Sequence, residues 1–197
     1  MNLIFQRTAE RRYAVRVKRP ELPDLVMDPA PGYDPLMPHD LLHLVVESQL
    51  ELALGVFGQL SVGGTAGSFH PVVKSGVSAR DGARLRTRLN KRGKKLLRDG
   101  KDDGLLSERA AYICWHRWLA TSASADKRKT AGDMNDEANH LIKTTPINKI
   151  RALNEKKLDQ ICRRLDELSA HWSGLSVGGS MTVHWPDLAV TSNKNES

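Results

Sequence analysis

The sequence is poor in cysteine, in aromatic residues and in long apolar runs, and each shortage argues against a class of protein. Two of its 197 residues are cysteines, Cys114 and Cys162, which is too few for a disulfide framework. No stretch approaches the roughly 18 consecutive apolar residues of a membrane-spanning helix, and the apolar run at the start is too short for a secretion signal. We therefore expect a cytoplasmic protein rather than a secreted or membrane-spanning one.

The sequence also lacks the motifs of several large enzyme classes. It contains no nucleophile elbow, no dinucleotide-binding fingerprint, no cysteine pair for zinc and no set of kinase motifs. Hydrophobic residues make up 40% of the chain, which is enough for one core that needs no disulfides. We expect a single globular domain over residues 1–190, followed by a disordered tail over residues 191–197.

Alternating apolar residues predict strands near both ends of the chain. Apolar and polar side chains alternate in residues 11–18 and again in residues 181–185, and short apolar runs at 3–6 and 25–27 add candidate strands. The region between them has the spacing of amphipathic helices. This order predicts an α+β fold, in which a small antiparallel sheet formed by N-terminal strands and a C-terminal strand is covered by four or five helices.

The most apolar helix of the chain is expected to begin at Pro38. Proline suits the first position of a helix, and the acidic Asp40 in the first turn is stabilised by the positive end of the helix dipole. Leucine and valine side chains then cover most of the circumference, which is typical of a helix that is buried on several sides. Along the edge of this apolar arc lie His39, His43 and Glu47, four residues apart.

The spacing His39-Asp40-x-x-His43 resembles the zincin signature H-E-x-x-H, with Asp in place of Glu. In zincins the two histidines bind zinc and the Glu activates the metal-bound water, so the resemblance implies His39 and His43 as ligands and Asp40 as a catalytic residue. It covers five residues and departs from the signature at the catalytic position. Glu47 is a second candidate catalytic carboxylate, but it lies about 12 Å along the helix axis from His39 and cannot share one ion with both histidines.

This hypothesis makes the protein a metal-dependent hydrolase, or a relic of one that kept the metal, with zinc or another divalent metal as cofactor. A third ligand is expected from elsewhere in the chain, and the candidates are His70, His116, His140 and His171. The alternative is structural. In that case His39 and His43 are border residues, hydrogen-bonded to the backbone or to a carboxylate.

The excess positive charge of the chain is concentrated in one predicted helix, residues 79–98. Residues 80–101 contain ten Lys or Arg and two Asp, whereas the other 175 residues contain 20 basic and 21 acidic side chains. Six cations fall within about 80° of one another on a helical wheel: Arg80, Arg84, Arg88, Lys91, Lys95 and Arg98. Such a row suits a nucleic acid, another polyanion or an acidic protein. A protein-interaction module without catalysis is the remaining alternative.

Two boundaries are predicted in the second half of the chain. A turn over residues 99–104 is expected after the basic helix, with Ser107 as the N-terminal cap of the next helix. The small polar residues at 121–132 predict a linker before a further helix.

Overall fold

Six strands form one antiparallel sheet in the part of the chain that the structure describes. The structure is a computed structural model, and it describes residues 1–73 and 76–193. The strands have the spatial order β4-β3-β2-β1-β5-β6, and every pair of neighbours is antiparallel. Their bounds are β1 (Asn2–Ala9), β2 (Arg12–Lys18), β3 (Leu25–Ala30), β4 (His70–Pro71), β5 (Ser180–His184) and β6 (Val190–Asn193).

One face of the sheet is apolar because successive side chains of a strand point to opposite faces. Leu3 and Phe5 of β1 lie opposite Val17 and Val15 of β2, and on the other side of β1 Phe5 lies opposite Met181 of β5. All five side chains are fully buried. The C-terminal strand β5 therefore joins the N-terminal strands in one sheet, which confirms the predicted α+β class.

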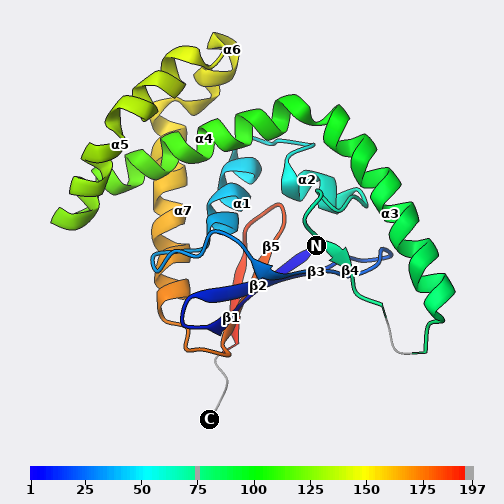
Figure 1. The fold of residues 1–197 in the computed structure, drawn as a ribbon. Helices are drawn as coiled ribbons and strands as arrows, with labels where there is room; N and C mark the ends of the chain where they lie inside the picture. Colours follow the sequence, from blue (N-terminus) through cyan, green and yellow to red (C-terminus); the bar gives the residue numbers. More distant parts are fainter. Residues whose placement is uncertain (74–75, 194–197) are drawn as a thin grey trace.

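The helices lie on one side of this sheet, as Figure 1 shows. The described residues contain seven α-helices and one short 3₁₀ helix, more than the four or five that were expected. Their bounds are α1 (His39–Gln49), α2 (Val56–Ser61), α3 (Ala79–Asp99), α4 (Lys101–Ala120), α5 (Ala125–Thr144), α6 (Ile147–Ile150), η1 (Arg151–Leu153) and α7 (Glu155–Ser173).

The helix α1 lies between the sheet and α4 (Figure 1). It packs against α4, α7 and α2, and every residue from Leu41 to Glu47 is buried. A helix enclosed in this way needs apolar side chains around most of its circumference. The prediction that this helix is buried on several sides is confirmed.

The boundary between the basic helix and the next helix differs from the prediction. α3 ends at Asp99 and α4 begins at Lys101, so the expected turn over residues 99–104 is reduced to Gly100. Ser107 is not an N-terminal cap, because it lies in the second turn of α4 and is only 1% exposed. The polar side chain at this position has buried partners, which are described below.

The predicted linker at 121–132 was also wrong over most of its length. α5 begins at Ala125, where the side chain of Ser124 accepts a hydrogen bond from the backbone N–H of Lys127. α4 and α5 then pack side by side along much of their length. A polar sequence can remain helical when a capping residue starts the helix and a neighbouring helix packs against it.

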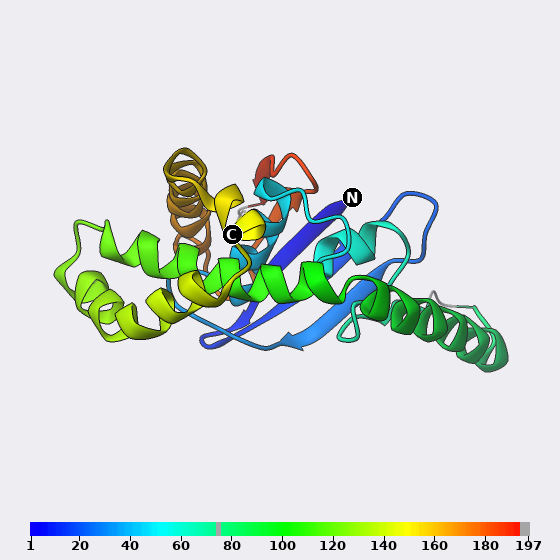
Figure 2. The same cartoon turned by 90° about the horizontal axis from the view of Figure 1, so that it is seen from above.

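The basic helix α3 projects from the rest of the molecule (Figure 2). Its expected extent is confirmed within one residue, yet only Gly82, Leu89 and Gly93 of its 21 residues are buried. Its contacts with α2, α4 and β4 are few. α3 is therefore an arm attached to the domain rather than a part of its core.

The C-terminal end of the described chain differs from the prediction. Residues 191–193, expected in a disordered tail, belong to β6, which pairs with β5. The other residues of that predicted tail, 194–197, lie outside the described residues. In the described ranges, none of the helices has the length and hydropathy required to span a membrane.

Candidate metal centre

The structure brings His39 and His43 together at the start of α1. The two residues are one helical turn apart, and their ring centroids lie 4.5 Å from each other with the ring planes inclined by 69°. His39 is the first residue of the helix and is exposed, whereas His43 is only 5% exposed. The pair therefore joins a buried ring to one that reaches solvent.

A carboxylate from α4 completes a group of three candidate ligands. Nε2 of His43 lies 3.7 Å from Oε2 of Glu108, and one ligand atom from each of His39, His43 and Glu108 lies within 4.8 Å of the other two. In tetrahedral zinc sites, bonds of about 2.0–2.2 Å place neighbouring ligand atoms roughly 3.4 Å apart. The pair formed by His43 and Glu108 is close to that spacing. The side chains of His39 and Glu108 are exposed.

Ser107, the residue before Glu108, connects the buried histidine to a second carboxylate. Its Oγ lies 2.8 Å from Nδ1 of His43 and donates a hydrogen bond of 2.9 Å to Oε1 of Glu47. The chain of contacts runs from Glu47 through Ser107 to the ring of His43. Metal-binding histidines usually have such a partner on the nitrogen that does not face the metal, because it fixes the ring orientation and the tautomer.

Glu47 is held at the N-terminus of α2, one of the places where a buried carboxylate is best stabilised. Its two oxygens accept hydrogen bonds of 2.8 Å from the backbone N–H groups of Val56 and Phe57. Gly55 makes this approach possible, because a Cβ atom there would overlap the carboxylate. Burial raises the pKa of Glu47 to about 7, and the bonds from Phe57, Ser107 and Val56 oppose that rise.

The ionisation of Glu47 decides which nitrogen of His43 carries the proton. When Glu47 is ionised, its oxygens only accept, so Ser107 donates to Glu47 and accepts from the Nδ1–H group of His43. Nε2 then carries a lone pair and faces the carboxylate of Glu108. This is the tautomer that a metal bound at Nε2 requires.

The contact of 3.7 Å between His43 and Glu108 is not an ion pair at neutral pH. Burial, and then the charge of His39, lower the pKa of His43 to about 4, so its ring is neutral. With Glu47 ionised, the lone pair of Nε2 and a carboxylate oxygen of Glu108 face each other at the surface of the domain. A cation between them removes the repulsion of these two electron-rich atoms.

The carboxylate of Asp40 is not a member of the three-residue group, although the sequence places it at the catalytic position of the zincin signature. Its Oδ2 accepts a short hydrogen bond from the hydroxyl of Tyr13, which lies on β2. Burial raises the pKa of Asp40, and the Tyr13 hydrogen bond opposes that rise. Asp40 thus ties the first turn of α1 to the sheet.

The third member of the candidate group is Glu108 and not another histidine, as had been expected. His116 is bonded to Asn135 at 2.7 Å, and none of His70, His116, His140 and His171 belongs to the group. The sequence offered one usable signal for Glu108. Ser107 and Glu108 directly follow two leucines inside a helix, a pattern that suits one buried partner and one surface partner.

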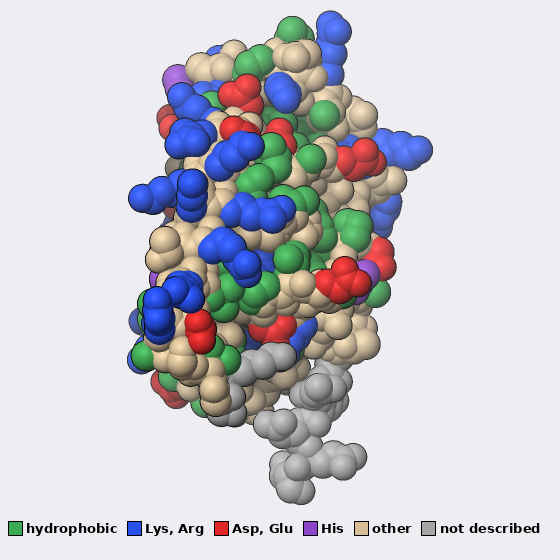
Figure 3. All heavy atoms as spheres, turned by 90° about the vertical axis from the view of Figure 1, so that its right-hand side faces the viewer, with side chains coloured by type: hydrophobic (Ala, Val, Ile, Leu, Met, Phe, Trp, Pro, Cys, Tyr) green, Lys and Arg blue, Asp and Glu red, His purple; other side chains and the backbone are tan. Residues whose placement is uncertain are grey.

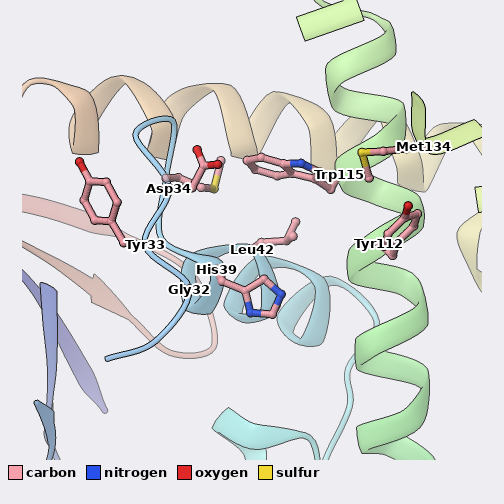
Figure 4. A pocket seen from close by; sticks show the side chains of 9 residues that line it. Gly32, Tyr33, Asp34, His39, Leu42, Tyr112, Trp115 and Met134 are labelled. Atoms are coloured by element: carbon pink, nitrogen blue, oxygen red, sulfur yellow. The ribbon is translucent and has the colours of Figure 1, made fainter. Parts of the chain in front are cut away.

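A pocket of about 370 Å³ opens beside His39. Figure 4 shows His39 and Leu42 of α1 on one side and Tyr112 and Trp115 of α4 on the other, with Met134 of α5 above them. The segment before α1 closes the remaining side. It contributes the residues Gly32, Tyr33, Asp34 and Met37.

The six cations that the sequence singled out are all exposed on α3. Figure 3 shows Lys and Arg side chains following one another down the side of the molecule that carries this helix. A groove of about 670 Å³ lies along its C-terminal half. Lys and Arg residues make up most of its lining: Arg88, Lys91, Arg92, Lys94, Lys95 and Arg98.

Comparisons of the chain with protein-family models, with curated proteins and with solved structures found no match.

Proposed function

We propose that His39, His43 and Glu108 bind one divalent metal ion and that the protein is a metal-dependent hydrolase. The observation that carries the proposal is the cluster of His39, His43 and Glu108, in which Nε2 of His43 lies 3.7 Å from the Glu108 carboxylate while Ser107 contacts Nδ1 from behind. Two histidines and one glutamate are a ligand set of catalytic zinc sites, and imidazole with carboxylate also suits iron. Zinc is the metal that this set fits best.

Three protein ligands would leave a fourth position open. A zinc ion held by these ligands would supply a bound water of lowered pKa as the nucleophile for hydrolysis. The other polar residues near the site have supporting roles. Glu47 and Ser107 are positioning residues for His43, and Asp40 anchors the helix to Tyr13 rather than acting as the base that the zincin resemblance implied.

Metal content of purified protein tests the metal site. We expect about one zinc per chain by inductively coupled plasma mass spectrometry after zinc loading and gel filtration, and loss of that metal in His43→Ala. His116→Ala is the matched control, because His116 is a histidine of α4 that is bonded to Asn135 of α5 and lies outside the ligand group. Equal zinc in His43→Ala and the native protein, with an unchanged circular dichroism spectrum, would contradict the proposal.

A second function is supported by α3, for which we propose binding to the phosphate backbone of a nucleic acid duplex. The helical row from Arg80 to Arg98 is about 27 Å long and its cations are exposed. Within the described residues, the only ion pair of the row joins Arg84 to Asp81 at 3.8 Å, and both side chains are well exposed. The row presents one cation per about 5 Å of helix, and a duplex carries one phosphate per about 1.7 Å of its axis, so every cation has a phosphate within reach.

The chemistry of α3 favours a duplex over the other polyanions. The helix contains no aromatic residue, so it offers no surface for stacking the bases of a single strand. Its outward face carries no large apolar side chain between the cations, so it offers neither a membrane anchor nor the apolar centre of a protein interface. Binding should weaken steeply with salt and depend little on sequence. Affinity for a duplex that stays constant between 50 and 200 mM salt would contradict this proposal.

A further inference from the structure

We propose that the pocket beside His39 receives an apolar group of the substrate, so that the substrate is an ester or amide with an aromatic or aliphatic side group. This inference rests on the proposed metal-dependent function. The carbonyl of the ester or amide lies at the metal ligands, where water replaces the alcohol or amine, and the apolar group enters the pocket.

The pocket and the metal ligands are parts of one cleft between α1 and α4. On α4, Glu108, Tyr112 and Trp115 follow one another at intervals of four and three residues, so they share one face of the helix. On α1, His39 belongs both to the ligand group and to the lining of the pocket. A ligand that extends from the metal along this face of α4 reaches Tyr112 and then Trp115.

The lining of the pocket favours an apolar ligand group. Leu42, Met37 and Met134 contribute aliphatic and thioether surface, and Tyr112 and Trp115 contribute aromatic surface. None of the nine residues that line this pocket in the described structure is Lys or Arg. The volume of about 370 Å³ lies at the small end of the range for ligand pockets. A single ring or a short alkyl chain fits this description, and the phosphates of a nucleic acid do not.

The backbone before α1 forms the rim of the pocket and packs directly against His39, which is one of the proposed metal ligands. Gly32 has φ of +71°, and a Cβ atom there would come within 2.7 Å of the Cβ of His39. The carbonyl of Gly32 accepts a hydrogen bond of 3.1 Å from the backbone N–H group of His39. The ligand and the rim are thus fixed relative to each other, so a substrate held in the pocket has a defined position at the metal.

A series of hydroxamates tests the pocket on the zinc-loaded protein. The hydroxamate head binds zinc, and the tails range from acetohydroxamate through hexanohydroxamate to octanohydroxamate, with affinity measured by isothermal titration calorimetry. We expect affinity to rise by up to about fourfold for each methylene that is buried, until the pocket is full. Zinc uptake with the same affinity for all tails would overturn the pocket alone, whereas absence of zinc uptake would overturn the metal site and the pocket together.

Two matched variants test whether the alkyl tail of the hydroxamate lies in the pocket. Met134→Trp fills the pocket, whereas Ile142→Trp makes a similar change on α5 at an exposed position outside it. We expect Met134→Trp to reduce the affinity for octanohydroxamate at least tenfold, to the level of acetohydroxamate, with zinc content unchanged. Ile142→Trp should bind both compounds as the native protein does. Retention of the full tail dependence in Met134→Trp would overturn the inference.

Discussion

The candidate sites in the cleft between α1 and α4 and on the arm α3 differ in how their residues are brought together. In the cleft, Glu47, Ser107 and His43 are buried and each is held by hydrogen bonds to residues far away in the sequence. On α3, the cations are exposed and follow one another along a single helix. A site of the first kind depends on the tertiary structure, whereas one of the second kind is already present in the local sequence.

The same contrast sets how each region should respond to change. Removal of one buried partner in the cleft leaves another polar group unsatisfied, which is costly. The charges of α3 act through water, where single charges contribute little and salt weakens them. A single substitution in the cleft should therefore have a large effect. On α3, the size of the effect should depend on how many charges are changed.

The largest effect is expected from charge reversal on α3. The triple variant Arg84→Glu, Lys91→Glu, Lys95→Glu should lower the affinity for a DNA duplex by about 100-fold or more at low salt, because it removes three phosphate contacts. The slope of log affinity against log salt should decrease by about 3. Fluorescence anisotropy with a labelled duplex over a range of salt concentrations measures both quantities, and zinc content should not change.

The control for this variant makes the same change of charge elsewhere. Lys129→Glu, Lys143→Glu and Lys156→Glu reverse three exposed cations that lie outside α3. This variant should keep most of the duplex affinity and of the salt slope. An equal loss in both triple variants would mean that net charge, and not the arm, determines binding.

The next largest effect is expected at Ser107, which connects the two buried groups of the cleft. Ser107→Ala leaves His43 Nδ1–H and one oxygen of Glu47 without this partner, so zinc affinity should fall by about 10- to 100-fold. The free energy of unfolding should fall by about 1–3 kcal/mol. Competition with a chelating dye measures the first quantity and urea unfolding the second. Native zinc affinity in Ser107→Ala would show that the contacts from Glu47 through Ser107 to His43 do not support metal binding.

A smaller effect concerns the pH dependence of stability in metal-free protein. The pKa of Glu47 rises from 4.5 to about 7 on folding, so the folded state binds this proton more tightly and stability falls as pH rises between these values. The pKa of His43 falls from 6.5 to about 4, so the unfolded state binds this proton more tightly and stability rises with pH in that range. The two contributions nearly cancel between about pH 4.5 and 6.5.

Single variants should separate the two contributions. In His43→Gln the Glu47 contribution remains, and stability should fall with rising pH by up to about 1.4 kcal/mol per pH unit. In Glu47→Gln the sign should be reversed. Urea unfolding at pH 5.0, 5.5 and 6.0 measures the slopes, and equal slopes in the two variants would contradict the opposite shifts of the two pKa values.

The smallest effect is expected on the stability of the arm. In Gly82→Ala the new methyl group lies 3.5 Å from Val73, an ordinary contact, so α3 should gain up to about 1 kcal/mol of helix propensity. In Gly93→Ala the methyl group would approach Oγ1 of Thr65 to 2.6 Å, which offsets that gain. Hydrogen exchange should show stronger protection of α3 in Gly82→Ala than in Gly93→Ala.

The parts of the structure that follow from local periodicity could be predicted from the sequence. The alternation in residues 11–18 and 181–185 indicated two strands of the sheet, and the apolar circumference after Pro38 indicated a helix enclosed by its neighbours. The bounds of α3 also followed from its charges and its leucines. In each case a residue and its close neighbours in the chain carry the information.

The parts of the site that depend on distant contacts could not be predicted. The spacing of His39 and His43 was visible, but Glu108 and Ser107 come from a helix that begins more than 50 residues later. Ser107 was interpreted as a helix cap because serine favours that position, and its burial between His43 and Glu47 depends on packing. For the same reason the sequence could not indicate that Tyr13 holds Asp40.

The most direct test of the central claim is a crystal structure of the zinc-loaded protein, with anomalous differences measured on both sides of the zinc absorption edge. We expect one strong anomalous peak within about 2.0–2.2 Å of a nitrogen of His39, Nε2 of His43 and a carboxylate oxygen of Glu108. A map without a peak at these three side chains, or with the zinc bound elsewhere on the chain, would contradict the account.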